Sequence, residues 1–206
     1  MSLLLRLMGS TDTTATEADR RQARSQAMSA AAPGDWLSVV LRHHQQIEAA
    51  FQAVAASQDQ NDRRIAFSEL TRLLTGHCNA EESVLYPALA QCGETRHAEH
   101  AYVEQAHTKM HLASLELLVP MSQEFVEELA LLRQAVVQHH YEEEAHWFIE
   151  LLQGTGVEMQ RRLGQRVQQE FDRYVCSDEL IGVLESIEQS RPTNPMPAHS
   201  SCDDCS

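Results

Sequence analysis

The sequence predicts an all-α protein: an up-down-up-down four-helix bundle with an additional C-terminal helix and disordered termini. Apolar residues recur at helical spacing in five successive segments. Short breaks that contain Pro, Gly, Asp or Ser separate the first four segments, which is typical of antiparallel neighbours in a bundle. With 43% hydrophobic and 5% aromatic residues, the composition is that of a soluble globular protein and favours helix.

The 206 residues fit one domain plus tails, and we divide them into four parts. Residues 1–33 are expected to form a flexible N-terminal arm, because they lack sustained apolar periodicity. Residues 34–154 form the bundle, and residues 155–190 form a C-terminal helical extension. Residues 191–206 are rich in proline and are expected to be a disordered tail. The apolar run at the start is too short to span a bilayer, and we identify no signal peptide.

The first predicted helix covers residues 36–54 and follows Asp35, a residue suited to capping a helix. Its apolar stripe includes His44. The second helix opens at Asn61, and we expect Pro87 to end it within about a turn.

The third predicted helix covers residues 94–118 and is ended by Pro120. The fourth is capped by Ser122 and closes at Gly154. A fifth amphipathic segment covers residues 163–187, and we expect it to pack on the open side of the bundle.

The second and fourth helices contain an internal repeat. HCNAEESVLYP starts at His77 and HHYEEEAHWFI starts at His139, and each places acids four and five residues after the histidine and an aromatic nine residues after it. Because residues i and i+4 share a helical face, the pairs His77/Glu81 and His139/Glu143 interrupt stripes that are otherwise apolar. Buried imidazoles and carboxylates need strong partners, and a pair of metal ions would supply them.

Counting from the turns locates the residues at the same level on the other two helices. His44 lies 17 residues before Asn61 and His77 lies 16 after it, so these histidines are level. For His139, 17 residues after Ser122, the level partner is near position 105. We assign the nearby His107, with His111 one turn away on its face. The predicted metal ligands are His44, His77, Glu81, His107, His111, His139 and Glu143.

This mixture of imidazoles and carboxylates suits iron, manganese or zinc rather than calcium, which prefers oxygen ligands alone. Two carboxylates among five imidazoles are suited to bridging two metals about 3.5 to 4 Å apart. The ligand count leaves a coordination position open, where a small diatomic ligand or a peroxide would bind.

At these motifs the chain resembles the hemerythrin and HHE cation-binding family. The resemblance rests on RHHQQIEAAF, HCNAEESVLYP and HHYEEE and covers about residues 36–152. It implies a di-iron centre of two iron ions inside the bundle, with iron preferred over zinc or manganese. Its oxygen-carrying branch has HxxxH on the third helix, which His107 and His111 match, and an acid one residue later on the fourth, which makes Glu144 the alternative to Glu143.

Two functions follow as expectations. The first is a non-heme di-iron protein that binds or reacts with oxygen, nitric oxide or peroxide. The alternative is a non-catalytic regulatory or interaction module that responds to iron or oxygen. A mononuclear or zinc structural site is a third possibility. Neither the physiological ligand nor the oligomeric state follows from the sequence, and the question of enzymatic activity stays open.

Charge and cysteine usage exclude other classes. A net charge of -14 repels phosphate backbones and anionic lipids, so we expect no nucleic-acid or membrane partner. Five unevenly spaced cysteines do not form a disulfide framework, and they favour a reducing cytoplasm. The terminal Cys202 and Cys205 are read as part of a passive tail.

Several further polar residues are expected outside the metal layer. We expect outer positions for His43, His140, Glu82 and Glu144, with Glu144 kept as an alternative ligand. Surface positions are expected for His97, His100 and His146.

Overall fold

The computed structural model describes residues 15–175. The predicted tail at 191–206 and the part of the C-terminal extension beyond residue 175 lie outside this range. Within it, nearly every residue is helical and there is no strand, which confirms the all-α prediction. No helix in this part of the chain is both long and apolar enough to cross a membrane.

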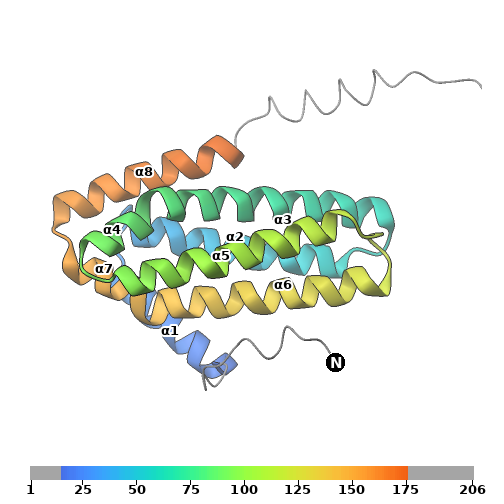
Figure 1. Cartoon of the computed structure of the whole chain (residues 1–206), viewed down its shortest axis with the longest axis horizontal. Coiled ribbons are helices and arrows are strands. Elements are labelled where there is room, and N and C mark those ends of the chain that lie inside the picture. Colours follow the sequence, from blue (N-terminus) through green and yellow to red (C-terminus); the bar gives the residue numbers. More distant parts are fainter. Residues whose placement is uncertain (1–14, 176–206) are drawn as a thin grey trace, which may run out of the picture. The chain divides into compact units, whose positions relative to one another are not determined.

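Four long helices lie side by side along the long axis of the molecule (Figure 1). Three- to six-residue loops or short extra helices connect them. They are α2 (Trp36–Ala56), α3 (Gln60–Ala80), α5 (Thr95–Glu116) and α6 (Gln123–Glu142).

Side-chain caps define where three of these helices begin. The Asp35 carboxylate accepts a hydrogen bond from the backbone N–H of Ser38 at 2.7 Å, and the Ser122 hydroxyl accepts one from Phe125 at 3.1 Å. Asp59 caps α3, so this helix begins slightly before the expected Asn61. Each such cap stabilises its helix by about 1 kcal/mol.

The two halves of the internal repeat share a structural feature as well as a sequence. In the first half α3 widens into the π-helical turn η2 (Glu81–Leu85), followed by α4 (Tyr86–Gln91). In the second half α6 widens into η3 (Glu143–Trp147), followed by α7 (Phe148–Gly154). Both π-turns therefore begin at the acid of a His-x-x-x-Glu pair, and such turns are frequent at functional sites.

The second helix ends at Gln91, four residues after Pro87, in agreement with the prediction that this proline ends it within about a turn. Proline lacks an N–H, and its ring crowds the carbonyl four residues earlier. The turn directly before it is wider than an α-helical one, with the N–H of Tyr86 bonded to the carbonyl of Glu81. Helical structure consequently continues through Gln91.

The expected flexible arm contains a helix, α1 (Glu17–Ala30). Thr16 and Asp19 form a reciprocal cap at its start, and Ala23 and Ala27 are buried where α1 contacts η3 and α2. The apolar face consists of alanines alone, which is why apolar periodicity did not reveal this helix.

The fifth amphipathic segment forms α8 (Val157–Val175), which lies against α2 and α3 (Figure 1). Its buried face includes Leu163, Val167 and Phe171. Two glycines permit the close approach. A Cβ on Gly164 would lie 3.0 Å from the backbone nitrogen of Trp36, and one on Gly76 would lie 3.2 Å from the carbonyl oxygen of Phe171.

Replacing Gly164 by leucine is therefore expected to destabilise the protein by about 1 to 3 kcal/mol, since the added side chain would push α8 from the start of α2. The same substitution at Gly156, where no atom lies within 4 Å of the added Cβ, is the matched control. Urea unfolding followed by circular dichroism measures both. Equal stability of the two variants would contradict the tight packing of α8.

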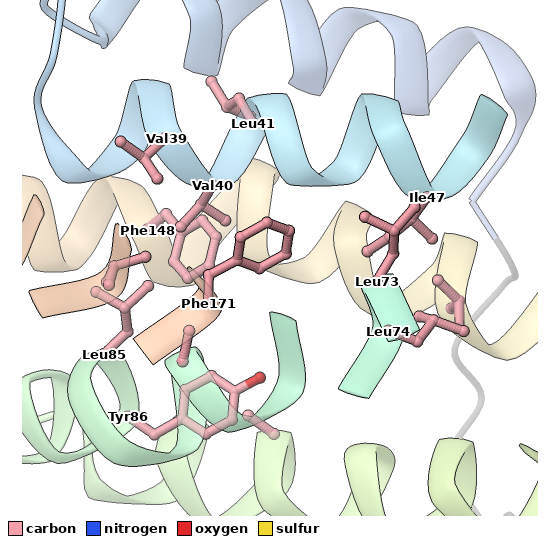
Figure 2. Packing of buried hydrophobic residues seen from close by; sticks show 14 of the residues in the cluster. Val39, Val40, Leu41, Ile47, Leu73, Leu74, Leu85, Tyr86, Phe148 and Phe171 are labelled. Carbon is pink, nitrogen blue, oxygen red and sulfur yellow. The ribbon is translucent and has the colours of Figure 1, made fainter. Parts of the chain in front are cut away.

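Aromatic and aliphatic side chains fill the bundle around a polar centre. The Trp36 and Phe148 rings meet edge to face with centroids 5.3 Å apart. Figure 2 shows Phe148 and Phe171 grouped near Val40, and Tyr86 with its hydroxyl directed toward the interior. All of these side chains are buried. Buried polar side chains lie at the centre of this packing.

Candidate metal centre

Histidines and glutamates from both halves of the repeat meet in the middle of the helices. His44 comes from α2, His77 and Glu81 come from α3 and η2, and His139 and Glu143 come from α6 and η3. Each of the five is at most 4% exposed. These are five of the seven residues that the sequence predicted as ligands.

The five side chains lie close to one another. The Nε2 atom of His44 is 3.4 Å from Oε2 of Glu143 and 3.9 Å from Oε1 of Glu81. The His77 Nε2–Glu81 Oε2 and His139 Nε2–Glu143 Oε1 distances are both 3.3 Å. Ligand atoms of His44, His77, Glu81 and Glu143 all lie within 4.8 Å of one another, as a shared metal site requires.

Unsatisfied atoms show that the cluster fits metal ions. Nε2 of His44, Nε2 of His77, Oε1 of Glu81 and Oε2 of Glu143 are buried without a hydrogen-bond partner among the residues that the structure describes. Leaving such polar atoms unpaired in an interior is costly. A bound cation would satisfy all four, and imidazole with carboxylate is a donor set suited to iron, manganese or zinc.

Two outer carboxylates orient the imidazoles. Nδ1 of His44 is 2.6 Å from Oε1 of Glu144, and Nδ1 of His139 is 2.8 Å from Oε2 of Glu104. A histidine that donates its Nδ1–H to a carboxylate presents the other nitrogen, Nε2, to a metal. Both Nε2 atoms face the cluster, so the arrangement matches a metal-binding tautomer.

The charges of the metal-free cluster are strongly coupled. Burial and the neighbouring Glu143 raise the pKa of Glu81 to about 7. Burial also favours protonated Glu143, but the His139 imidazolium outweighs it and lowers the pKa of Glu143. For His44, burial disfavours the charge, but the neighbouring carboxylates of Glu143 and Glu144 outweigh it and raise the pKa to about 10. Protonated imidazoles therefore balance the carboxylates, and a cation would take over that role.

Two polar residues of the cluster, Tyr86 and Gln105, were not predicted as site residues from the sequence. The Tyr86 hydroxyl lies 3.1 Å from Oε2 of Glu81 and 3.0 Å from Nε2 of His139. Gln105, 1% exposed, donates hydrogen bonds to Glu81 and Tyr86. A signal was present for Tyr86, which is the aromatic nine residues after His77 and carries a polar end, unlike its counterpart in the second half.

The structure corrects the contribution expected from the third helix. His107 is exposed on α5, and His111 forms an ion pair with Glu128 at 2.7 Å, so neither joins the cluster. Counting from the turn located the level near 105 correctly, and Gln105 is there. Two residues farther along a helix, however, the side chain is rotated by about 200°, so His107 points away from the cluster.

His43 and His140, expected at outer positions, are buried at 1% and 5% exposure. The ring of His43 stacks on Phe171 of α8 with centroids 3.6 Å apart, and that of His140 stacks on His44 at 3.7 Å. Ring nitrogens of His44, His77 and His140 form a second group of potential ligands within 4.8 Å. The outer positions were wrong because Phe171 of α8 covers the ring of His43, and the ring of His140 packs against that of His44.

The remaining acids and histidines divide between interior and surface. Glu144 was expected to be solvated, but it is 2% exposed. Glu82 is half-buried and pairs with Lys109 at 2.6 Å. His100 and His146 are exposed, and His97 is half-buried. The cysteines of the terminal motif lie outside the described residues, and Cys78 is buried and free.

One of three comparisons with known proteins points to a cation-binding domain. A family model described as Hemerythrin HHE cation binding domain matches residues 37–151. A DNA nickase of Nostoc sp. (strain PCC 7120 / SAG 25.82 / UTEX 2576) is 27% identical over 110 residues, which are 53% of this chain and 31% of that protein. The match thus spans less than a third of the relative's length. No solved structure matches the chain.

Proposed function

This chain belongs to the hemerythrin HHE cation-binding domain family, and from that premise we propose that it holds two iron ions and binds or reacts with oxygen, nitric oxide or peroxide. In this proposal the four long helices α2, α3, α5 and α6 form an up-down-up-down bundle around the site. The single observation that supports the proposal most strongly is the group of four buried ligand atoms without a hydrogen-bond partner in the part of the chain that the structure describes.

The residues proposed to hold the metal are those that meet in the cluster: His44, His77, Glu81, His139 and Glu143. Two of them are carboxylates, each close to imidazoles from different helices, and a carboxylate in that position is suited to bridging two ions. His107 and His111 are left out, because they lie on other faces of α5.

Bound iron would supply redox chemistry and an electrophilic position for a small ligand. The protein would supply the surroundings. Apolar side chains such as Phe148 and Leu85, both buried, keep bulk water away from the cluster. The Tyr86 hydroxyl, within 3.1 Å of Glu81 and Glu143, is placed to donate a hydrogen bond or a proton beside the ligand position.

Iron loading tests the proposal. Purified protein would be loaded with Fe²⁺ without oxygen, desalted and then exposed to air. We expect about two iron ions per chain and new near-ultraviolet absorption on exposure, followed by spectral change with nitric oxide or peroxide. Less than one iron per chain, or a colourless air-exposed protein, would contradict it.

The alternative function, a regulatory module, is favoured by one observation: α1 and α8, two helices outside the four long ones, contact residues next to the cluster. In that case iron or oxygen would change how these helices dock, without turnover. Peroxide consumption and protease resistance, each measured with and without iron, separate the two functions. A large iron-dependent change in resistance without consumption favours the module.

DNA nicking, the activity in the name of the Nostoc relative, is not part of our proposal. The aligned segment is 31% of that protein, and the net charge of -14 on this chain disfavours contact with a phosphate backbone.

A further inference from the structure

Helix α1 reaches the candidate metal centre through one side chain, Arg24. Its Nε lies 2.7 Å from both carboxylate oxygens of Glu144 in η3. By contrast, the bonds of Arg20 and Arg21 stay within the start of the same helix, to Ala15 and Glu17. The family model begins at residue 37, so α1 is an element that the cation-binding domain itself does not include.

The contact continues inward from Glu144. Oε1 of this carboxylate, which Arg24 holds, is 2.6 Å from Nδ1 of His44. The opposite nitrogen of His44, Nε2, is one of the buried atoms without a hydrogen-bond partner and faces Glu143 and Glu81. Arg24, Glu144 and His44 thus form a continuous chain of bonds from α1 to a ligand atom.

We propose that Arg24 is a positioning residue for the metal centre: through Glu144 it orients His44, and so makes α1 part of the site. This inference rests on the proposed function, because it concerns the metal affinity of the same cluster. Removing an outer residue that orients a metal ligand, as Glu144 does directly and Arg24 does through Glu144, typically changes metal affinity by about 10- to 100-fold.

The contact between Arg24 and Glu144 holds α1 in place as well as holding Glu144 against His44. Only the small side chains of Ala23 and Ala27 are buried on its apolar face, which contribute little apolar area. The charged contact of the Arg24 Nε with both oxygens of the buried Glu144 carboxylate is therefore a main anchor of α1. Whatever weakens this contact is expected to release α1 and to leave Glu144 free to turn away from His44.

The position of α1 also shapes an approach to the cluster. A cavity of about 1160 Å³ lies between α1 and the helices α2 and α6. Arg24, His140 and Glu144 are among its lining residues, so it extends to the second group of histidines. Helix α1, held in place by Arg24, therefore lines one side of the cavity through which a small ligand would reach the site.

The test measures binding of Co²⁺, whose visible absorption reports ligand geometry, to full-length variants. Replacing Arg24 by alanine is expected to lower Co²⁺ affinity by about 10-fold and to shift the visible spectrum. Lysine at position 24 should restore part of the affinity, because it keeps the positive charge but lacks the planar guanidinium whose Nε contacts Glu144. The matched control is Arg21→Ala, which removes an exposed arginine of the same helix that pairs only with Glu17.

A double-mutant cycle shows whether Arg24 acts through Glu144. The variant Arg24→Ala/Glu144→Ala should bind Co²⁺ as weakly as Glu144→Ala alone. Circular dichroism of each metal-free variant verifies that the fold is retained. Additive losses, or an affinity of Arg24→Ala equal to that of Arg21→Ala, would overturn the inference. A wild-type chain that binds neither Co²⁺ nor Fe²⁺ would instead refute the proposed function.

Discussion

Replacing His77 or His139 by alanine is expected to abolish iron retention, whereas replacing His146 by alanine is expected to leave it unchanged. His77 and His139 lie in opposite halves of the repeat, and each is 3.3 Å from the carboxylate of its own His-x-x-x-Glu pair. Without either imidazole, the site loses one of its three proposed nitrogen donors, and His44 remains near that carboxylate. His146 is exposed, although it belongs to the same π-turn as Glu143.

Iron content after loading and desalting, determined by mass spectrometry, measures this effect. Circular dichroism checks that each variant is folded, since alanine also removes a buried ring that contacts its neighbours. Equal loss of iron from all three variants would mean that retention does not depend on the cluster. Full retention by His77→Ala and His139→Ala would place the metal elsewhere.

Removing the metal is expected to cost the protein several kcal/mol of stability. At a free metal concentration about 1,000 times Kd, binding to the folded state alone stabilises it by about 4 kcal/mol. For a domain of this size that corresponds to a rise in Tm of roughly 10 °C. The physical reason is the group of buried ligand atoms that have no hydrogen-bond partner among residues 15–175.

Thermal unfolding with Fe²⁺ under anaerobic conditions, and again after chelation, measures the difference. The variant Glu81→Gln keeps the shape of the side chain but loses the carboxylate charge, so its Tm should no longer respond to iron. Glu69→Gln, at an exposed position of α3, is the control and should respond as the wild type does. An iron response of Glu81→Gln as large as that of wild type would show that the stabilisation arises outside this cluster.

The residues of the site differ in how directly they would act on the metal. His77 and Glu81 provide ligand atoms, whereas Arg24 acts only on the orientation of His44. Loss of the ligands should therefore eliminate binding, and loss of Arg24 should weaken it. Such a difference between the two kinds of variant is expected for a metal centre. It is not expected for a buried network of hydrogen bonds that binds only protons.

Much of the architecture was predictable from local signals. The all-α class follows from apolar periodicity, and the cap residues Asp35 and Ser122 place two helix starts where the structure has them. The repeated His-x-x-x-Glu pairs and the level of His44 followed from counting residues along helices of known rise. These signals act over one or two helical turns, so the amino-acid sequence contains them directly.

The tertiary structure alone decided which further residues face the cluster. The choice of Gln105 over His107 depends on the rotation of α5 about its axis, which packing against α6 determines. Burial of Glu144 depends on α1, and burial of His43 depends on α8, since each covers a face that a four-helix bundle would expose. A helix repeats its own pattern with a fixed period, but what its outer face meets depends on segments far away in the chain, and no local pattern specifies that contact.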